Sequence, residues 1–134
     1  MTVVDLRVIG VPAPQGSKTR MPNGAMVEGG SAAGRAKHRA WRTAVAEAAV
    51  GKVDEPLDGP LQLVAEFFLP RPASRKRDRW ADRKPDLDKL LRCTLDGLTD
   101  AGLIRDDARV AYISASKELA DTWTGATLRV QPCP

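Results

Sequence analysis

The chain is poor in the features that mark membrane, secreted and disulfide-linked proteins. Its 134 residues include 2 Cys and 1 His, and aromatic residues make up 4%. Its longest apolar stretches, Leu61 to Leu69 and Val110 to Ala115, are far shorter than the roughly 18 to 20 residues that cross a bilayer. The sequence starts without a basic segment followed by a long apolar run, so we expect no signal peptide, no membrane partner and a cytoplasmic location.

The cysteines and the charge balance further narrow the class of protein. Cys93 and Cys133 have no second Cys or His at metal-site spacing, so we predict that both are reduced thiols. Apolar residues make up 43% of the chain, enough for a hydrophobic core, and the length fits one domain over residues 1–134. Lys and Arg number 21 against 17 Asp and Glu, a net charge of +4 that suits a polyanionic partner.

Hydrophobic periodicity predicts elements in the order β-α-β-α-β-β. Predicted strands alternate apolar and polar residues, and predicted helices repeat apolar residues every three or four positions. The strands are Thr2 to Ile9, Leu61 to Leu69, Arg109 to Lys117 and Thr124 to Gln131, and the helices are Arg35 to Val50 and Asp86 to Ala101. We expect an α/β (α+β) two-layer sandwich, with the helices packed on a mixed sheet whose central strand is Leu61 to Leu69.

The segment between the first strand and the first helix is predicted to be a loop. Residues 10–34 contain three prolines and six glycines, a composition that often becomes fixed only on a ligand. Its start, Gly10 to Thr19, has a superficial likeness to a phosphate-binding loop. Pro12 and Pro14, however, remove backbone N–H groups that such a loop points at phosphate, and the spacing from Gly to Lys does not fit. We expect no nucleotide cofactor.

Two acidic pairs lie within otherwise basic sequence. Asp86 and Asp88 start the second predicted helix, where two carboxylates one residue apart can converge on Mg²⁺, a cation that prefers oxygen ligands. A structural alternative remains open, because Asp is a favoured N-cap and complements the helix dipole. Asp106 and Asp107 follow the helix and equally fit an acidic turn. Whether Asp107 reaches Asp86 and Asp88 depends on the sheet order.

A cation follows the first acidic pair along the helix. Asp88, Arg92 and Asp96 are spaced i, i+4, i+8 and therefore share one face. Surface salt bridges explain this spacing, and so does a metal site in which Arg92 stabilises charge on a scissile phosphate. Basic residues alone would bind DNA better than basic residues mixed with carboxylates. The carboxylates in this strongly basic region therefore favour the metal site, in which a cation bridges them to phosphate.

The region that holds both acidic pairs resembles a known family. Arg83 to Arg92 reads RKPDLDKLLR, and Leu95 to Val110 reads LDGLTDAGLIRDDARV. This pattern, about 28 residues without a gap, is similar to the signature of the RusA family of Holliday junction resolvases, which cut four-way DNA junctions. The loop from Val11 to Gly16 resembles the family's proline-containing segment more weakly.

The resemblance implies a site and a mechanism. Asp86, Asp88 and Asp107 would be the catalytic carboxylates that bind Mg²⁺, with Mn²⁺ as a substitute, and Arg92 would take the place of a functional Lys. Lys89 stands where the family usually has Asn. Its ammonium group can contact phosphate or weaken metal binding by charge repulsion. The resemblance also implies a homodimer that resolves junctions by paired symmetric nicks in DNA recombination and repair. Such a protein would act at the nucleoid, and proteins of this family are often encoded by a phage or prophage.

Basic residues around the site are expected to hold the DNA backbone. They lie in the first loop, in the segment from Arg71 to Arg83 and at the start of the second helix: Lys18, Arg20, Arg71, Arg75, Lys76, Arg77, Arg79, Arg83, Lys84 and Lys89. The start of the first helix is also basic, and Arg35, His38, Arg39 and Arg42 share one of its faces. Trp80 lies among the arginines, where we favour ordinary packing over base stacking.

Two other functions compete with a resolvase. The first is a non-catalytic junction- or DNA-binding protein in which Lys89 has impaired the metal site. The second is a basic RNA-binding adaptor, which leaves the spaced acidic pairs unexplained and has only Trp80 as a stacking aromatic in the basic segment.

Overall fold

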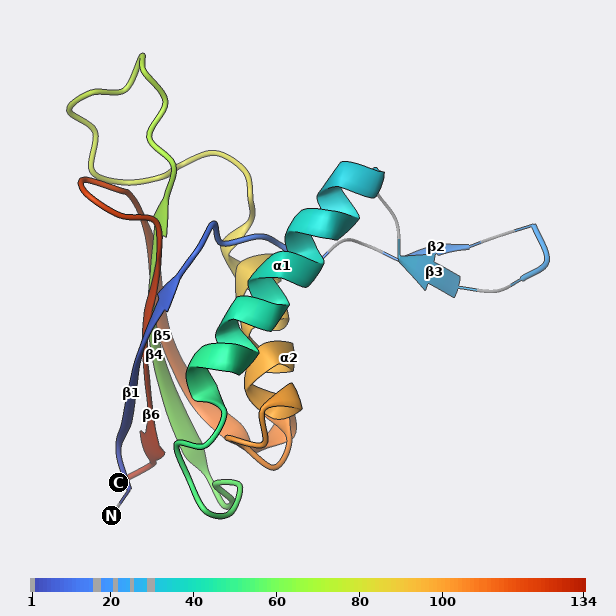
Figure 1. Cartoon of the computed structure of the whole chain (residues 1–134), viewed down its shortest axis with the longest axis vertical. Helices are drawn as coiled ribbons and strands as arrows, with labels where there is room; N and C mark the ends of the chain where they lie inside the picture. Colours follow the sequence, from blue (N-terminus) through green and yellow to red (C-terminus); the bar gives the residue numbers. More distant parts are fainter. Residues whose placement is uncertain (1, 16–17, 21, 25, 29–30) are drawn as a thin grey trace.

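A computed structural model describes residues 2–15, 18–20, 22–24, 26–28 and 31–134 (Figure 1). The strands are β1 (Val4–Ile9), β2 (Lys18–Arg20), β3 (Met26–Glu28), β4 (Leu61–Leu69), β5 (Val110–Leu119) and β6 (Gly125–Pro132). The helices are α1 (Ala32–Ala49) and α2 (Leu87–Asp100), and a short 3-10 turn, η1 (Asp107–Arg109), leads into β5. The main sheet with its two helices confirms the predicted β-α-β-α-β-β order and α+β class.

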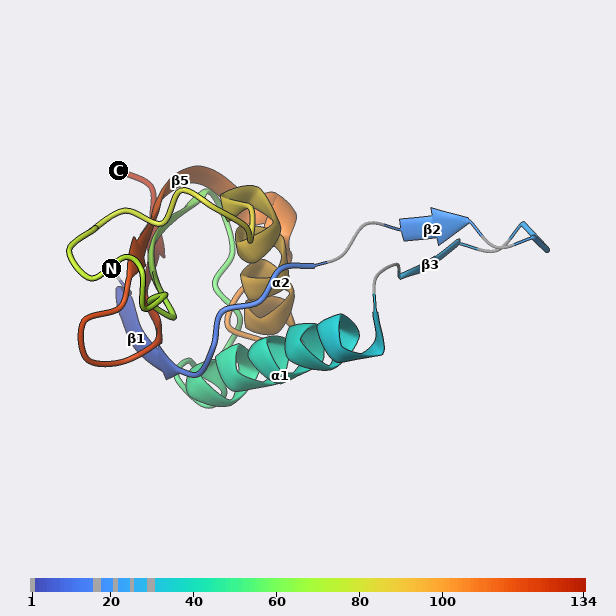
Figure 2. The same cartoon turned by 90° about the horizontal axis from the view of Figure 1, so that it is seen from above.

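The main sheet has four strands in the order β1-β6-β4-β5. β4 and β5 run parallel, whereas β6 pairs antiparallel with both β1 and β4, so the predicted mixed sheet is confirmed. β4 lies inside the sheet, as its apolar alternation predicted. The hairpin of β2 and β3 was not predicted; it lies within residues 10–34 and projects from the two-layer body (Figures 1 and 2).

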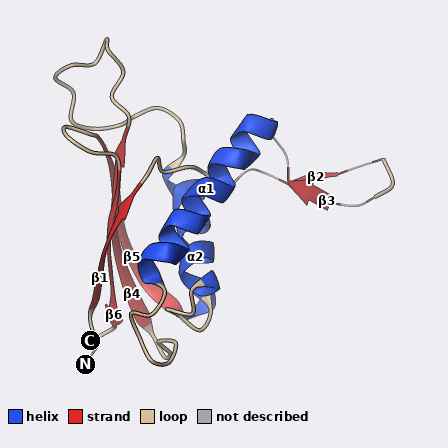
Figure 3. Ribbon diagram, viewed as in Figure 1, coloured by secondary structure: helices blue, strands red, loops and turns tan. Residues whose placement is uncertain are grey.

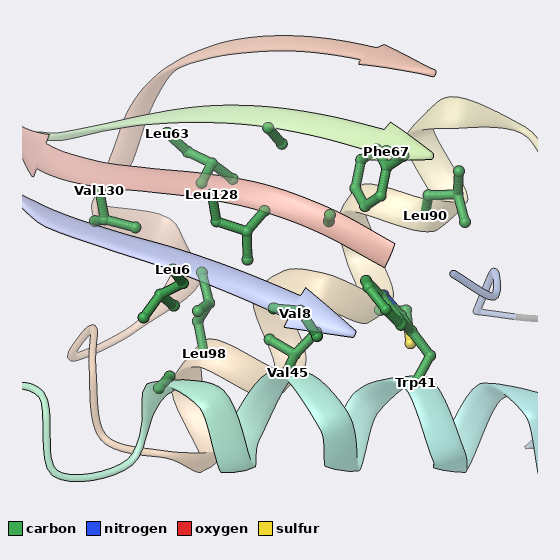
Figure 4. Close-up of a cluster of buried hydrophobic side chains, with 14 of the residues drawn as sticks. Leu6, Val8, Trp41, Val45, Leu63, Phe67, Leu90, Leu98, Leu128 and Val130 are labelled. Atoms are coloured by element: carbon green, nitrogen blue, oxygen red, sulfur yellow. The ribbon is translucent and has the colours of Figure 1, made fainter. Parts of the chain in front are cut away.

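Both helices cover the same face of the sheet (Figure 3). The core between the layers is built from alternate strand residues and one side of each helix (Figure 4). Its largest side chains, almost completely buried, are Trp41, Phe67, Leu61, Leu63, Leu90, Leu98, Leu103, Ile104 and Leu128. Each such side chain contributes roughly 1.5–3 kcal/mol by leaving water. The core thus fixes the position of α2, which carries the first acidic pair.

A close helix contact sets α2 against α1. The indole Nε1 of Trp41 donates to Thr94 Oγ1 at 3.1 Å, which satisfies two polar groups inside the core. At the surface, Arg42 binds Asp100 through two hydrogen bonds of 2.6 and 2.9 Å, and this hydrogen bonding, aided by the Arg42 charge, lowers the pKa of Asp100. Buried Cys93 donates its thiol to the carbonyl of His38, consistent with the predicted reduced cysteine.

Gly97→Ala is expected to destabilise the protein by about 1–3 kcal/mol, because overpacking forces rigid groups apart. A Cβ on Gly97 would lie 2.8 Å from the backbone oxygen of Arg42 and 2.8 Å from Val45 Cβ. Chemical denaturation measures the change, with Thr99→Ala on the exposed side of α2 as the control. An unchanged free energy of unfolding in Gly97→Ala would contradict this account of helix packing.

The end of α2 is fixed by the predicted glycine cap. Gly102 adopts φ +72°, its N–H donates to Thr99 O, and Leu103 N–H donates to Leu98 O. The side chains of Leu98 and Leu103 are both fully buried, as this type of cap favours. The cap turns the chain toward Asp106 and Asp107.

Among the described residues, no helix is long and apolar enough to span a membrane.

β5 forms one edge of the main sheet. Its last three residues pair with residues 79–81: Ala81 N–H donates to Lys117 O, and Leu119 N–H donates to Arg79 O. The rest of this edge, residues 110–116, has no strand beside it within the described part of the chain. Tyr112 and Ile113 on that stretch are 56% and 41% exposed.

Candidate active site

The first acidic pair lies at the N-terminal end of α2. Asp86 is the N-cap residue with an extended backbone, but its side chain makes no capping hydrogen bond. In α1, by contrast, the N-cap Ser31 uses its Oγ to accept from Gly34 N–H at 3.0 Å. Asp88 is exposed in the first turn of α2. The structural explanation for Asp86 is therefore weakened, because its carboxylate is not used as a cap.

Lys117 holds the segment that leads into α2. Its Nζ, at the end of β5, donates to the carbonyl oxygens of Arg83 at 2.6 Å and Pro85 at 2.8 Å. These bonds fix the backbone just before Asp86. Sequence reasoning did not select Lys117, because it lies within a regular strand and nothing in its spacing points to a residue thirty positions earlier. It is a positioning residue for the acidic pair.

The nuclease activity that the resemblance to the RusA family implies is expected to fall about tenfold or more in Lys117→Met, because small displacements of positioned groups are costly to a reaction. The loss should appear in the metal concentration needed for half-maximal cleavage, and Lys117→Arg should restore part of it. Lys52→Met, which removes an exposed cation from the connector between α1 and β4, controls for the loss of charge. Equal metal requirements in Lys117→Met and the wild type would contradict the positioning role.

The second acidic pair lies beyond the other end of α2. Asp106 caps η1 by accepting from Ala108 N–H at 2.9 Å, which holds its pKa below the usual range. The pKa of Asp107 is raised, first by its hydrogen bond with Asp106 and then by partial burial and the nearby charges of Asp106 and Asp96. Crowding of this kind favours binding of a proton or a cation.

The two acidic pairs do not meet within one chain. The 14 residues of α2 span about 21 Å, and Asp106 and Asp107 come just before β5, whose far end lies beside the start of α2. Within the described residues, no three His, Cys, Asp or Glu side chains gather into a group that could hold a metal ion.

A cleft opens beside Asp86. It has a volume of about 470 Å³ and lies between residues 11–15, the end of β4 and the start of α2, with Lys37 of α1, Lys84, Asp86 and Lys89 among its lining residues. Gln15 N–H donates to the carbonyl of Lys89 at 3.2 Å, which attaches the loop to α2. Arg92 is exposed one helical turn beyond Asp88. The sequence analysis found Lys84, Lys89 and Arg92 but not this cleft.

Two predicted DNA-binding arginines instead hold together the basic loop, residues 71–84. Arg71 is largely buried, and its guanidinium donates to the carbonyls of Arg75, Asp78, Leu119 and Ala120 and to Asp121. Arg75 binds the carboxylates of Asp78 and Asp82, and these contacts raise its pKa. These arginines shape the loop, so its outward-facing cations are displayed on an ordered segment.

The outward-facing cations of this loop are Lys76, Arg77, Arg83 and Lys84. Arg79 is 69% exposed; it pairs with Glu118 at 2.8 Å and lies 4.4 Å from the centre of the Trp80 ring. Trp80 itself is 53% exposed, so it is not packed in the core. The backbone of β2 carries Lys18 and Arg20, whose side chains lie outside the described residues.

The basic start of α1 divides between interior and surface. His38 is buried and Arg42 is paired with Asp100, whereas Lys37 and Arg39 are exposed. The predicted shared basic face of α1 is therefore partly used for packing against α2.

Comparison with protein families agrees with the arrangement of the fold and the acidic residues. Residues 12–131 match the family Endodeoxyribonuclease RusA, which covers all of the candidate site residues. Comparison with individually curated proteins gives no match. The matched region contains β4, α2 and β5, the elements that carry or position the acidic residues. The chain therefore belongs to the RusA family of endodeoxyribonucleases, nucleases that act on Holliday junctions.

Proposed function

We propose that two copies of this chain form a Mg²⁺-dependent resolvase that makes paired symmetric nicks in a four-way DNA junction. The observation that carries the proposal is the pair Asp86 and Asp88, exposed at the start of α2 with the Asp86 carboxylate not used as a cap. Carboxylate oxygens are the ligands that Mg²⁺ prefers. We expect residues 1–134 to act as one such domain in the cytoplasm, at the nucleoid, where its DNA lies.

A dimer provides what one chain lacks. Asp107 lies at the far end of α2 from Asp86 and Asp88, so a site with all three carboxylates needs a second chain. The open edge of β5 supports such a dimer, because two β5 strands can pair antiparallel about a two-fold axis. With the axis at Ile113, Val110 would lie opposite the partner's Ser116. Asp107 would then approach the partner's segment before α2.

The three carboxylates suit this cation by their chemistry. Asp86 and Asp88 of one chain, with Asp107 of the other, would hold Mg²⁺, which would activate water and polarise the phosphodiester. The crowding that raises the pKa of Asp107 would be relieved by a cation. Arg92 would stabilise charge on the scissile phosphate, and Lys117 would keep Asp86 in place.

DNA binding rests on the exposed cations of the basic loop. Lys76, Arg77, Arg83 and Lys84 face solvent, and Arg71 and Arg75 preorganise the loop that carries them. Contacts of this kind bind phosphates and make affinity strongly dependent on salt. Two related sites on one dimer match the two-fold symmetry of a four-way junction, which favours paired nicks.

A non-catalytic junction-binding protein is the second candidate. It is supported by Lys89, whose ammonium group is carried next to Asp88 on α2 and beside the cleft that Asp86 lines. A cation at this position repels a metal ion, although the surrounding residues would still bind DNA.

Cleavage of a labelled synthetic four-way junction distinguishes the two candidates. The wild-type protein is incubated with the junction or with linear duplex, in Mg²⁺, Mn²⁺ or EDTA. The resolvase predicts symmetric nicks in the junction that need a divalent cation. Tight junction binding without a cut in either metal would favour the non-catalytic protein, and Lys89→Asn would then test whether removing the charge restores cleavage.

A further inference from the structure

We propose that the cleft beside Asp86 receives one unpaired nucleobase next to the scissile phosphate, and that Gln15 reads this base. The inference rests on the proposed function and adds to it the feature that selects where the junction is cut. The cleft volume of about 470 Å³ falls in the range of small-ligand sites, roughly 300–1,000 Å³.

The walls of the cleft suit a flat aromatic ring. Pro12, Ala13, Leu69, Pro70 and Pro85 contribute apolar surface from three separate parts of the chain. Pro12 and Ala13 are buried, and Lys117 fixes the carbonyl of Pro85, so these walls are held in place without a ligand. A preformed apolar slot binds a base by contact with its faces, which all bases share.

The charges at the cleft select a nucleotide over an uncharged apolar ligand. Lys37 comes from α1, Lys84 from the basic loop and Lys89 from α2, and all three line the same cleft. Phosphates on either side of an inserted base would lie within reach of these ammonium groups. The apolar walls and the three lysines together match one nucleotide of a DNA strand.

Gln15 is the neutral side chain that can tell bases apart. It lines the cleft, and its backbone N–H donates to Lys89 O at 3.2 Å, so its position relative to α2 is fixed. A Gln amide both donates and accepts, and it can pair with a base edge. Asp86 lines the same cleft, which puts the inserted base beside the proposed metal site.

A four-way junction supplies such a base at low cost. Bases in a linear duplex are paired and stacked, and extracting one costs a few kcal/mol, least where pairing is already disturbed. The branch point is where pairing is weakest. The cleft would therefore link recognition of the junction to recognition of a base at the cut.

Two measurements on the full-length protein test the proposal. In the first, junctions carry the fluorescent base 2-aminopurine at each branch-point position and are bound in EDTA, where no cleavage occurs. We expect fluorescence to rise severalfold at one position for the wild type and for Gln62→Ala, a matched substitution on β4 outside the cleft. Ala13→Leu, which fills the cleft, should abolish the rise. Because Ala13 is buried, Val11→Ala at the exposed rim serves as the second variant and should reduce the rise.

In the second measurement, junctions with randomised branch-point bases are cut in Mg²⁺. We expect the wild type and Gln62→Ala to prefer one base beside the nick by roughly tenfold, and Gln15→Ala to lose most of this preference while still cutting. An unchanged preference in Gln15→Ala, or no 2-aminopurine signal at any position, would overturn the proposal. Absence of cleavage by the wild type would instead refute the resolvase, and the fluorescence measurement would still decide whether the cleft takes a base.

Discussion

Asp88→Asn is expected to reduce junction cleavage by roughly 10³-fold or more while junction binding stays within about threefold of the wild type. The substitution keeps the size of the side chain but removes a charge that a divalent cation requires. Asp88 is exposed, and the core beneath α2 is made by other residues, so the fold should not change. Single-turnover cleavage and a binding titration on the same labelled junction measure the two quantities.

The matched control for this substitution is Asp54→Asn, an exposed carboxylate in the connector between α1 and β4. It removes the same charge in the connector that pairs with the residues after α2, away from the N-terminal end of α2, and should leave cleavage unchanged. Equal cleavage by Asp88→Asn and the wild type would show that Asp88 is only a surface residue in the first turn of α2.

Ile113→Asp is expected to convert the proposed dimer to monomers and to lower cleavage by about 100-fold or more at the same protein concentration. Ile113 is 41% exposed on the open edge of β5, and at a two-fold axis each substitution places two carboxylates opposite each other. A charge on an edge strand also opposes strand pairing in general. Analytical ultracentrifugation gives the oligomeric state, and circular dichroism checks that the fold is retained.

Ile9→Asp on the opposite edge strand provides the control for Ile113→Asp. Ile9 is 62% exposed at the end of β1, so the same change is made on the other edge of the same sheet. This variant should remain dimeric and active. A dimer that survives Ile113→Asp, or dissociates only in Ile9→Asp, would contradict pairing through β5.

The elements of the main sheet could be predicted because their sequences carry clear periodicity. Leu61 to Leu69 matches β4 residue for residue, and the predicted second helix differs from α2 only by its two cap residues. The apolar stripes of both helices face the core as predicted. The hairpin of β2 and β3 was missed because strands of three residues are too short to show alternation.

The contacts of the site were harder to predict because they join residues far apart in the chain. The spacing of Asp86 and Asp88 indicated a carboxylate pair, but only the parallel pairing of β4 and β5 puts Asp107 at the opposite end of α2. Charge counting treated Arg71 and Arg75 as DNA contacts, whereas their guanidinium groups bind loop carbonyls and carboxylates. Lys117 gave no signal, since its partners are backbone oxygens.

Subunit complementation tests the central claim most directly, that carboxylates from two chains build each active site. Asp88→Asn and Asp107→Asn chains are co-expressed with different tags, and the heterodimer is purified through both. One of its two sites would contain the unchanged Asp86 and Asp88 of one chain and the unchanged Asp107 of the other. We predict that each homodimer is inactive and that the heterodimer nicks one strand of the junction in Mg²⁺. A heterodimer that binds the junction but makes no nick, or an Asp107→Asn homodimer with full activity, would contradict the two-chain site.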